Sequence, residues 1–314
     1  MNYPKVTVGV PVYNSSNFIV PTLESINNQS YSNIEIIVLD DCSEDDSFRK
    51  IQDWKIKSKF PIRVLKNESN LGLTKCSSIL LRNAGGKYFQ KLDSDDLIYE
   101  KKIEEQVTLL ESESKENTGF IFSKVDLINE EGLLIKEKYF EKINFLRDVP
   151  EERSDLLKIL LRKNIIPNPS VLIITEALRS VGGYDENLFF EDWDIWIRLT
   201  LNYNFLFQKI ETCAYRIRAT SMENSSKTKL KRTETKIQMF QKYVHNDIPF
   251  QTLVLKTLCE MIIYSYFIGD KCVQKKMKWY LAHKFDLKIL IYFFMVKIGI
   301  PHPSKFLHGL SKNT

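Results

Sequence analysis

The sequence has few of the residues on which several classes of protein depend. Its five cysteines lie far apart, and no CxxC pair or Cys/His cluster occurs; they are Cys42, Cys76, Cys213, Cys259 and Cys272. A disulfide framework and a structural zinc site are therefore poorly supported, and a reducing compartment is expected. Eleven glycines and ten prolines among 314 residues exclude a fibrous chain.

Long apolar runs are also missing. The longest fully apolar run in the tail is Ile289–Val296, whereas a membrane-spanning helix needs about 20 such residues. Met1–Lys5 leads directly into a strand-like segment, without the apolar region of a signal peptide. We therefore expect a cytoplasmic protein that is not an integral membrane protein. The 43% of apolar and 27% of charged residues are ordinary for a globular chain with a large core.

Charge is unevenly distributed along the chain. Residues 223–314 contain 16 Lys and Arg but 6 Asp and Glu, whereas the whole chain has a net charge of only +5. The body is thus acidic and the tail basic. A basic tail can meet an anionic membrane or a nucleic acid, and a solvated helical face is the alternative. Nucleic-acid binding is not expected, because the tail carries no DNA-binding motif and no Gly-rich aromatic platform.

Strands and helices alternate in the first half. The patterns predict strands over Val6–Val12, Ile34–Leu39, Ile62–Leu65 and Tyr88–Leu92, and helices over Phe18–Asn28, Asp45–Lys57 and Thr74–Leu81. Such alternation predicts an α/β fold with a mostly parallel, Rossmann-like sheet covered by helices on both faces. Ligands bind beyond the carboxyl ends of the strands in such sheets.

Polar clusters follow three of these strands. They are Pro11–Asn14, Asp40–Ser43 and Asp93–Asp96, and they bring five carboxylates to one sheet edge. Such crowding favours a compensating cation, and an all-oxygen site suits a hard divalent ion such as Mg²⁺ or Mn²⁺. For Asp40 and Asp45 the alternative is that they cap a turn and a helix.

Five segments in order resemble a family 2 glycosyltransferase of the GT-A fold. They are VTVGVPVYN (6–14), IEIIVLDDCSEDDS (34–47), NLGLTK with GKYFQKLDSDD (70–75 and 86–96), GGYDENLFFEDWDIWIRL (182–199) and YRIRATSM (215–222), the last as a closing strand. The resemblance implies a GT-A domain over 1–222, with a nucleotide-sugar half over about 1–98 and an acceptor half over about 99–222. Residues 223–314 are expected to form a basic, aromatic-rich helical region.

The resemblance also implies roles for residues at the donor side. Tyr13 matches the position whose ring lies on the nucleotide base, and Asp41 matches the carboxylate that binds uracil or ribose. Asp93 and Asp95 match the metal motif, with Mn²⁺ or Mg²⁺ bridging to the diphosphate. The other expected nucleotide contacts are Pro11, Asn14, Lys75 and Ser94. Many relatives carry Arg-Asn where this chain has Ser77-Ser78, so a basic contact to the diphosphate is either absent or replaced by Lys75.

On the acceptor side, Asp192 matches the general base, and Glu191 beside it belongs to the expected catalytic pair. A single base opposite the leaving group implies one displacement with inversion at the anomeric carbon. Trp193 and Trp196 are candidates for stacking on an acceptor sugar, with burial in the core as the alternative. Gly182-Gly183 is expected to form a turn with positive φ before this segment.

The resemblance therefore implies transfer of a sugar from a nucleotide sugar, a UDP-sugar first, to a glycan acceptor. A lipid-linked intermediate of a surface polysaccharide is one such acceptor, and the basic, aromatic tail predicts peripheral contact with the inner face of the membrane. A catalytically silent relative that binds nucleotide or a partner is the alternative. A nucleotidyltransferase is a third reading, one that does not require Glu191-Asp192. The oligomeric state is not specified.

Overall fold

A computed structural model describes residues 4–113, 116–135, 149–218, 228–245 and 248–298. The chain divides into two compact units, Met1–Ser221 and Met222–Thr314. We call them the N-terminal unit and the C-terminal unit and describe each by itself.

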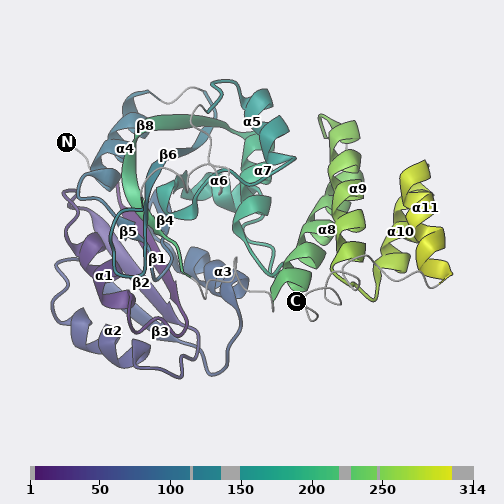
Figure 1. The fold of residues 1–314 in the computed structure, drawn as a ribbon. Coiled ribbons are helices and arrows are strands. Elements are labelled where there is room, and N and C mark those ends of the chain that lie inside the picture. Colours follow the sequence, from purple (N-terminus) through teal and green to yellow (C-terminus); the bar gives the residue numbers. More distant parts are fainter. Residues whose placement is uncertain (1–3, 114–115, 136–148, 219–227, 246–247, 299–314) are drawn as a thin grey trace. The chain divides into compact units, whose positions relative to one another are not determined.

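The first half of the N-terminal unit is a parallel sheet with helical connections (Figure 1). Strands β1 (Val6–Val12), β2 (Ile34–Asp40), β3 (Ile62–Lys66) and β4 (Tyr88–Lys91) pair in parallel, with β1 between β2 and β4. Helices α1 (Ile19–Asn27), α2 (Ser47–Lys55) and α3 (Leu73–Asn83) connect them. β1 and most of β2 are buried, as expected for parallel strands that are covered on both faces.

The second half extends this sheet with mixed strand directions. Among the described residues the strand order is β3-β2-β1-β4-β7-β6-β8-β5. These further strands are β5 (Leu97–Ile98), β6 (Thr118–Ile128), β7 (Leu172–Ile174) and β8 (Asn204–Arg216). β7 is antiparallel to β4 and β6, whereas β6 and β8 are parallel. The expected closing strand over 215–222 is therefore corrected: β8 begins earlier and ends at Arg216, and residues 219–222 lie outside the described ranges.

Further helices and a 3₁₀ turn lie in the described part of the N-terminal unit. They are α4 (Lys102–Ser112), α5 (Arg153–Leu160), η2 (Asn168–Ser170), α6 (Thr175–Ser180) and α7 (Asp192–Asn202). Gly182 and Gly183 adopt φ values of +89° and +63°, which confirms the turn with positive φ that the sequence predicted. The segment Glu130–Pro150 lies largely outside the described residues.

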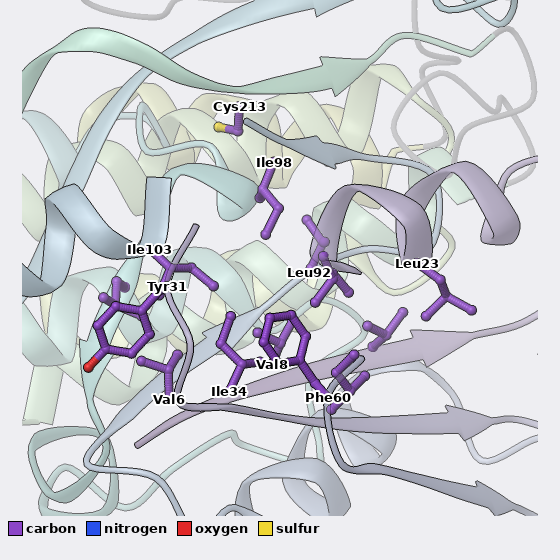
Figure 2. Close-up of a cluster of buried hydrophobic side chains, with 14 of the residues drawn as sticks. Val6, Val8, Leu23, Tyr31, Ile34, Phe60, Leu92, Ile98, Ile103 and Cys213 are labelled. Atoms are coloured by element: carbon purple, nitrogen blue, oxygen red, sulfur yellow. The ribbon is translucent and has the colours of Figure 1, made fainter. Parts of the chain in front are cut away.

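The core of this unit joins the two halves of the sheet. Figure 2 shows side chains from β1, α1 and β2 packed with Ile98 of β5, Ile103 of α4 and Cys213 of β8. Because these apolar groups are removed from water, the core fixes the strand ends from which the polar loops emerge.

The C-terminal unit is helical in its described part. Its helices are α8 (Lys229–His245), α9 (Gln251–Phe267), α10 (Val273–His283) and α11 (Leu287–Lys297). The Asp286 carboxylate caps α11 by accepting from the Lys288 and Ile289 amides. Within the ranges that the structure describes, no helix has the length and apolar character needed to cross a bilayer.

Candidate active site

The loops after β1, β2 and β4 emerge at one edge of the sheet, because the three strands are parallel neighbours. Asn14 follows β1 with a φ of +48°. Its backbone N–H donates to Ser43 Oγ at 3.0 Å, and its side-chain Oδ1 accepts from the backbone N–H of Glu44 at 2.9 Å. The loops after β1 and β2 are thus bound to each other, which makes this edge a single surface.

Of the predicted nucleotide contacts, Tyr13 and Lys75 are exposed, and 46% of Tyr13 is accessible to solvent. Pro11 is buried inside β1, so it is part of the strand and is not free to contact a nucleotide. Ser94 is almost buried, and its Oγ lies 2.6 Å from Ser15 Oγ. This hydrogen bond joins the loop after β4 to the loop after β1.

The carboxylate of Asp41 accepts hydrogen bonds from the loop that leads into α3. Asn67 Nδ2 and the Leu71 amide donate to its Oδ1 at 2.7 and 2.8 Å, and the Gly72 amide donates to its Oδ2 at 2.8 Å. A carboxylate offers about four acceptor positions, so most of its capacity is used within the protein. Asp41 therefore shapes the donor-side loop, and its contact with a nucleotide stays a prediction.

Asp40 caps a turn, as the alternative interpretation held. Its Oδ1 accepts from the Ser43 amide at 3.1 Å. Its Oδ2 is buried without a hydrogen-bond partner among the described residues. Asp45 likewise accepts from the Ser47 amide at the start of α2, at 2.9 Å.

Asp93 is held from two sides. Lys91 Nζ donates to its Oδ1 at 2.5 Å, and Asn168 Nδ2 from η2 donates to its Oδ2 at 2.8 Å. Lys91 also pairs with Glu191 Oε1 at 2.6 Å and is 2% exposed. Burial alone would lower the pKa of Lys91, but the charges of Asp93 and Glu191 raise it above its ordinary value.

Asp95 and Asp96 contact two arginines at and just after the end of β8, Arg216 and Arg218. Arg218 Nη1 lies 2.8 Å from Asp95 Oδ2, and its guanidinium carbon lies 4.6 Å from the centre of the Phe18 ring. The Arg216 amide donates to Asp96 Oδ1 at 2.9 Å. Burial still raises the pKa of Asp95, and burial with the neighbouring charges of Asp95 and Asp93 raises that of Asp96 well above its usual range.

The residues at this edge fit a divalent cation that a diphosphate helps to bind. Within the described ranges no group of three or more His, Cys, Asp or Glu side chains forms a metal site of its own. Mg²⁺ and Mn²⁺ are commonly bound by one or two carboxylates together with water and substrate phosphates. Asp95, with a side chain 22% exposed, and Asp93, at 27%, supply such oxygens.

Glu191 and Asp192 stand at the start of α7, on the other side of Lys91. Asp192 is half-buried, and its Oδ2 accepts from Asn164 Nδ2 at 2.7 Å. Burial, followed by the charge of Glu191, raises the pKa of Asp192 to about 7. A carboxyl group with this pKa accepts a proton at neutral pH far better than an ordinary aspartate.

The two tryptophans of α7 correct an expectation. Trp193 is 5% exposed and donates from Nε1 to the Leu160 carbonyl at 2.7 Å. Trp196 is 2% exposed and stacks with Phe120 at 6.4 Å between ring centres. Neither ring therefore presents a face to an acceptor sugar. The aromatic side of α7 is used to pack the helix against its neighbours.

Ser77 and Ser78, which depart from the family pattern, lie buried on α3. Ser77 Oγ donates to the Leu73 carbonyl at 2.9 Å, and Ser78 Oγ donates to the Tyr184 carbonyl at 3.4 Å. Thr74 Oγ1 donates to the Leu188 carbonyl at 2.9 Å. The Ser78 and Thr74 hydroxyls thus attach α3 to the segment that leads to α7, whereas the bond of Ser77 stays within α3.

Several side chains of this site were not predicted from the sequence: Lys91, Asn164, Asn168 and Arg216. A lysine at the end of an otherwise buried strand was the one available signal, because a buried ammonium requires an anionic partner.

Known proteins resemble this chain over much of its length. Residues 7–162 match the family described as "Glycosyl transferase family 2". An uncharacterized glycosyltransferase of Methanocaldococcus jannaschii is 30% identical over 227 residues, which cover 71% of this chain and 74% of that protein. The chain belongs to glycosyl transferase family 2. It is thus a glycosyltransferase. In another curated relative, the matched segment covers 29% of the relative's length.

Solved structures show the same fold. Residues 1–349 of Staphylococcus aureus TarS, in complex with UDP-GlcNAc, superpose with a TM-score of 0.62 at 19% identity, over 92% of this chain and 78% of that one. The mannosyltransferase PcManGT from Pyrobaculum calidifontis, in complex with GDP-Man and Mn²⁺, gives 0.62 at 15% identity, over 97% and 83%. The expected GT-A fold is confirmed.

Proposed function

We propose that this family 2 glycosyltransferase is metal-dependent and inverting, and that it moves a sugar from a UDP-sugar to a hydroxyl of a glycan. The observation that carries the proposal is that two acidic segments, distant in the sequence, lie close together at one sheet edge. Asp93 and Glu191 both pair with Lys91, which brings the donor-side carboxylates beside the candidate base Asp192. A transferase needs both groups around one anomeric carbon.

The donor side supports binding of a nucleoside diphosphate. Asp93 and Asp95 would hold Mn²⁺ or Mg²⁺, and that ion supplies positive charge to the diphosphate as it leaves. The exposed Tyr13 ring offers a surface for the base. Lys75 is exposed at the first turn of α3 and offers a positive charge in place of the Arg-Asn pair of many relatives.

Asp192 is the proposed base. Its carboxylate takes the proton from the attacking acceptor hydroxyl, and Asn164 holds one of its oxygens in place at 2.7 Å. One base and one displacement give inversion at the anomeric carbon, because the nucleophile enters opposite the leaving diphosphate. Glu191 is buried and paired, so we assign it to support of this segment rather than to proton transfer.

Calorimetric titration tests the donor assignment. The full chain is titrated with UDP, GDP and CDP, each with and without Mn²⁺, and Asp95→Ala serves as the site variant. We expect metal-dependent UDP binding that Asp95→Ala abolishes. Tighter GDP or CDP binding would redirect the donor, and the GDP-Man complex of PcManGT makes GDP the first competitor. Absence of binding by any nucleotide would contradict the proposal and favour a catalytically silent chain.

The C-terminal unit supports a lipid-linked acceptor at the inner face of the membrane. Four apolar side chains at helical spacing stand exposed on or directly after α11: Leu287 at 63%, Ile291 at 53%, Phe294 at 50% and Ile298 at 70%. We call them the α11 stripe. Lys288 and Lys297 are exposed on either flank of the stripe. Soluble surfaces rarely present such a row, and an interfacial helix has this arrangement.

Charge favours an anionic lipid surface as the occupant of the stripe. Between Lys271 and Ile298 the sequence has seven lysines and one acidic residue, Asp286. Lipid phosphates attract such a surface while the apolar stripe enters the boundary of the acyl chains. The acceptor would then be a glycan attached to a membrane lipid, as in the assembly of a surface polysaccharide.

A further inference from the structure

Lys91 lies between the two halves of the proposed reaction centre. It ends β4, and its side chain is 2% exposed. Its Nζ donates to Asp93 Oδ1 at 2.5 Å and pairs with Glu191 Oε1 at 2.6 Å. We propose that Lys91 is a positioning residue that fixes Asp93 relative to the Glu191–Asp192 segment, so that donor and base meet in register. This inference rests on the proposed function.

The burial of Lys91 excludes direct work on the substrate. At 2% exposure its ammonium cannot reach a diphosphate, and its N–H groups already donate to the two carboxylates. Lys91 must therefore act through Asp93 and Glu191. A lysine on a central strand is a firm support for this purpose, because β4 pairs with β1 on one side and with β7 on the other.

Two asparagines hold carboxylates at the two ends of this arrangement, Asp93 and Asp192. Asn168 binds the free oxygen of Asp93, and Asn164 binds Asp192, the residue after Glu191. The contacts form a continuous path from Asn168 through Asp93, Lys91 and Glu191 to the start of α7. Each carboxylate on the path is thus oriented by a neutral amide or by the shared ammonium.

A simpler role for Lys91 is to neutralise buried charge. One ammonium faces two carboxylates, so its loss would leave two like charges close together, and the chain would be destabilised. The two roles differ in one respect. Neutralisation of the buried Glu191 is needed only while Glu191 is charged, whereas Asp93, whose side chain is 27% exposed, needs Lys91 for its position in either case.

The double variant Lys91→Met/Glu191→Gln separates the roles, because it removes both charges of the inner pair. UDP binding with Mn²⁺ is measured by calorimetry, and release of nucleotide from UDP-GlcNAc and from GDP-Man is measured from pH 5 to pH 9. We expect cooperative unfolding close to that of the wild type, UDP affinity weaker by about tenfold, and a kcat plateau lower by about tenfold or more at every pH. A plateau and an affinity equal to those of the wild type would overturn the proposal.

Lys276→Met is a matched control. Lys276 also lies between two carboxylates, at 2.5 Å from Asp270 Oδ2 and 3.3 Å from Glu234 Oε1, but in the C-terminal unit. Its loss should lower the melting temperature and leave UDP affinity and kcat unchanged. A similar loss of kcat in Lys276→Met would show that general destabilisation accounts for the effect and would overturn the proposal.

Glu191→Ala serves if the double variant does not fold. It leaves the pair of Lys91 with Asp93 intact and breaks the path on the base side only. We expect kcat to fall about tenfold with UDP affinity unchanged, and an unchanged kcat would overturn the proposal. Failure of the proposed function looks different, because the wild type itself would then neither bind nucleotide nor release it from either donor.

Discussion

In the N-terminal unit, charged groups lie in the interior, whereas in the C-terminal unit large apolar groups lie on the surface. Lys91 and Glu191 are 2% and 4% exposed, and Leu287 and Ile298 are 63% and 70% exposed. Both arrangements cost free energy in an isolated, soluble chain. Each is understandable where a function requires it: a charged site needs oriented carboxylates, and an apolar row needs an apolar partner.

Two kinds of buried lysine also occur within the N-terminal unit. Lys91 has two carboxylate partners, whereas Lys102 has only amide oxygens, Gln90 Oε1 at 2.5 Å and Gln106 Oε1 at 2.7 Å. The pKa of Lys91 is raised and that of Lys102 is lowered to about 7, chiefly by burial. Lys91 thus contacts the carboxylates of the proposed reaction centre directly, whereas Lys102 is part of the polar interior between β4 and α4.

The largest effect is expected from removal of the base. Asp192→Asn keeps an oxygen toward Asn164 and loses the ability to take a proton. Catalysis by a positioned base contributes about 10²–10⁴-fold, so kcat should fall by that order while UDP affinity is unchanged. The measurement is nucleotide release from UDP-GlcNAc or GDP-Man beside calorimetry. A variant that retains full kcat would remove Asp192 from this role.

A somewhat smaller effect is expected at the apolar surface. Ile291→Glu/Phe294→Glu places two charges in the α11 stripe, and binding to vesicles that contain phosphatidylglycerol should weaken on the order of 100-fold. Co-sedimentation measures the partition. Ile56→Glu is the matched control, since Ile56 is an isolated apolar residue of the N-terminal unit at 89% exposure.

Unchanged vesicle binding of the stripe variant would contradict the assignment of the stripe to lipid. A wild type that forms dimers which the stripe variant abolishes, without binding to vesicles, would assign the stripe to a second copy of the chain. Failure of the wild type to bind vesicles at low salt would remove the membrane from the proposed function.

Lys102 should make stability depend on pH. The folded state holds the amine with a pKa of about 7, against 10.5 ordinarily. Between these values the unfolded chain binds a proton that the folded chain releases, so the cost is full below about pH 7 and is relieved as pH rises. The free energy of unfolding of the wild type relative to Lys102→Met should therefore rise by up to about 1.4 kcal/mol per pH unit.

Urea denaturation from pH 7 to pH 10 measures this difference. The comparison with Lys102→Met cancels groups common to both chains, except Cys213, whose raised pKa of about 12 lies above the range. A difference that is constant with pH would contradict the neutral, buried amine.

The strand ends could be predicted from sequence, and the pairing between them could not. Apolar β-branched runs fix β1 and β2 closely, and the polar residues after them had no role in the core. Glu191, the partner of Lys91 just before α7, lies in contrast far along the chain and is brought near only by the fold. No local pattern contains that information.

The same limit explains the tryptophans and the tail. α7 is apolar on most sides, so its sequence does not tell whether an aromatic ring packs in the core or faces solvent. In the tail, the stretch Lys271–Ile298 alternates lysines with aromatic and aliphatic residues. Its division into α10 and α11 depends on Asp286, a capping residue that becomes visible as such only with the helix it starts.

The smallest effect concerns the pH dependence of kcat. A base must be ionised to accept a proton, so kcat should rise with pH through about 7, the pKa of Asp192. The charge of Glu191 raises that pKa, whereas Lys91, Asn164 and the Trp193 amide lower it. Glu191→Gln removes the opposing charge and keeps an oxygen toward Lys91. The acidic limb of the kcat profile should then move to lower pH by roughly one pH unit or less. A limb that stays in place would mean that another group titrates, and a limb that moves to higher pH would mean that Glu191 stabilises the ionised base rather than opposing it.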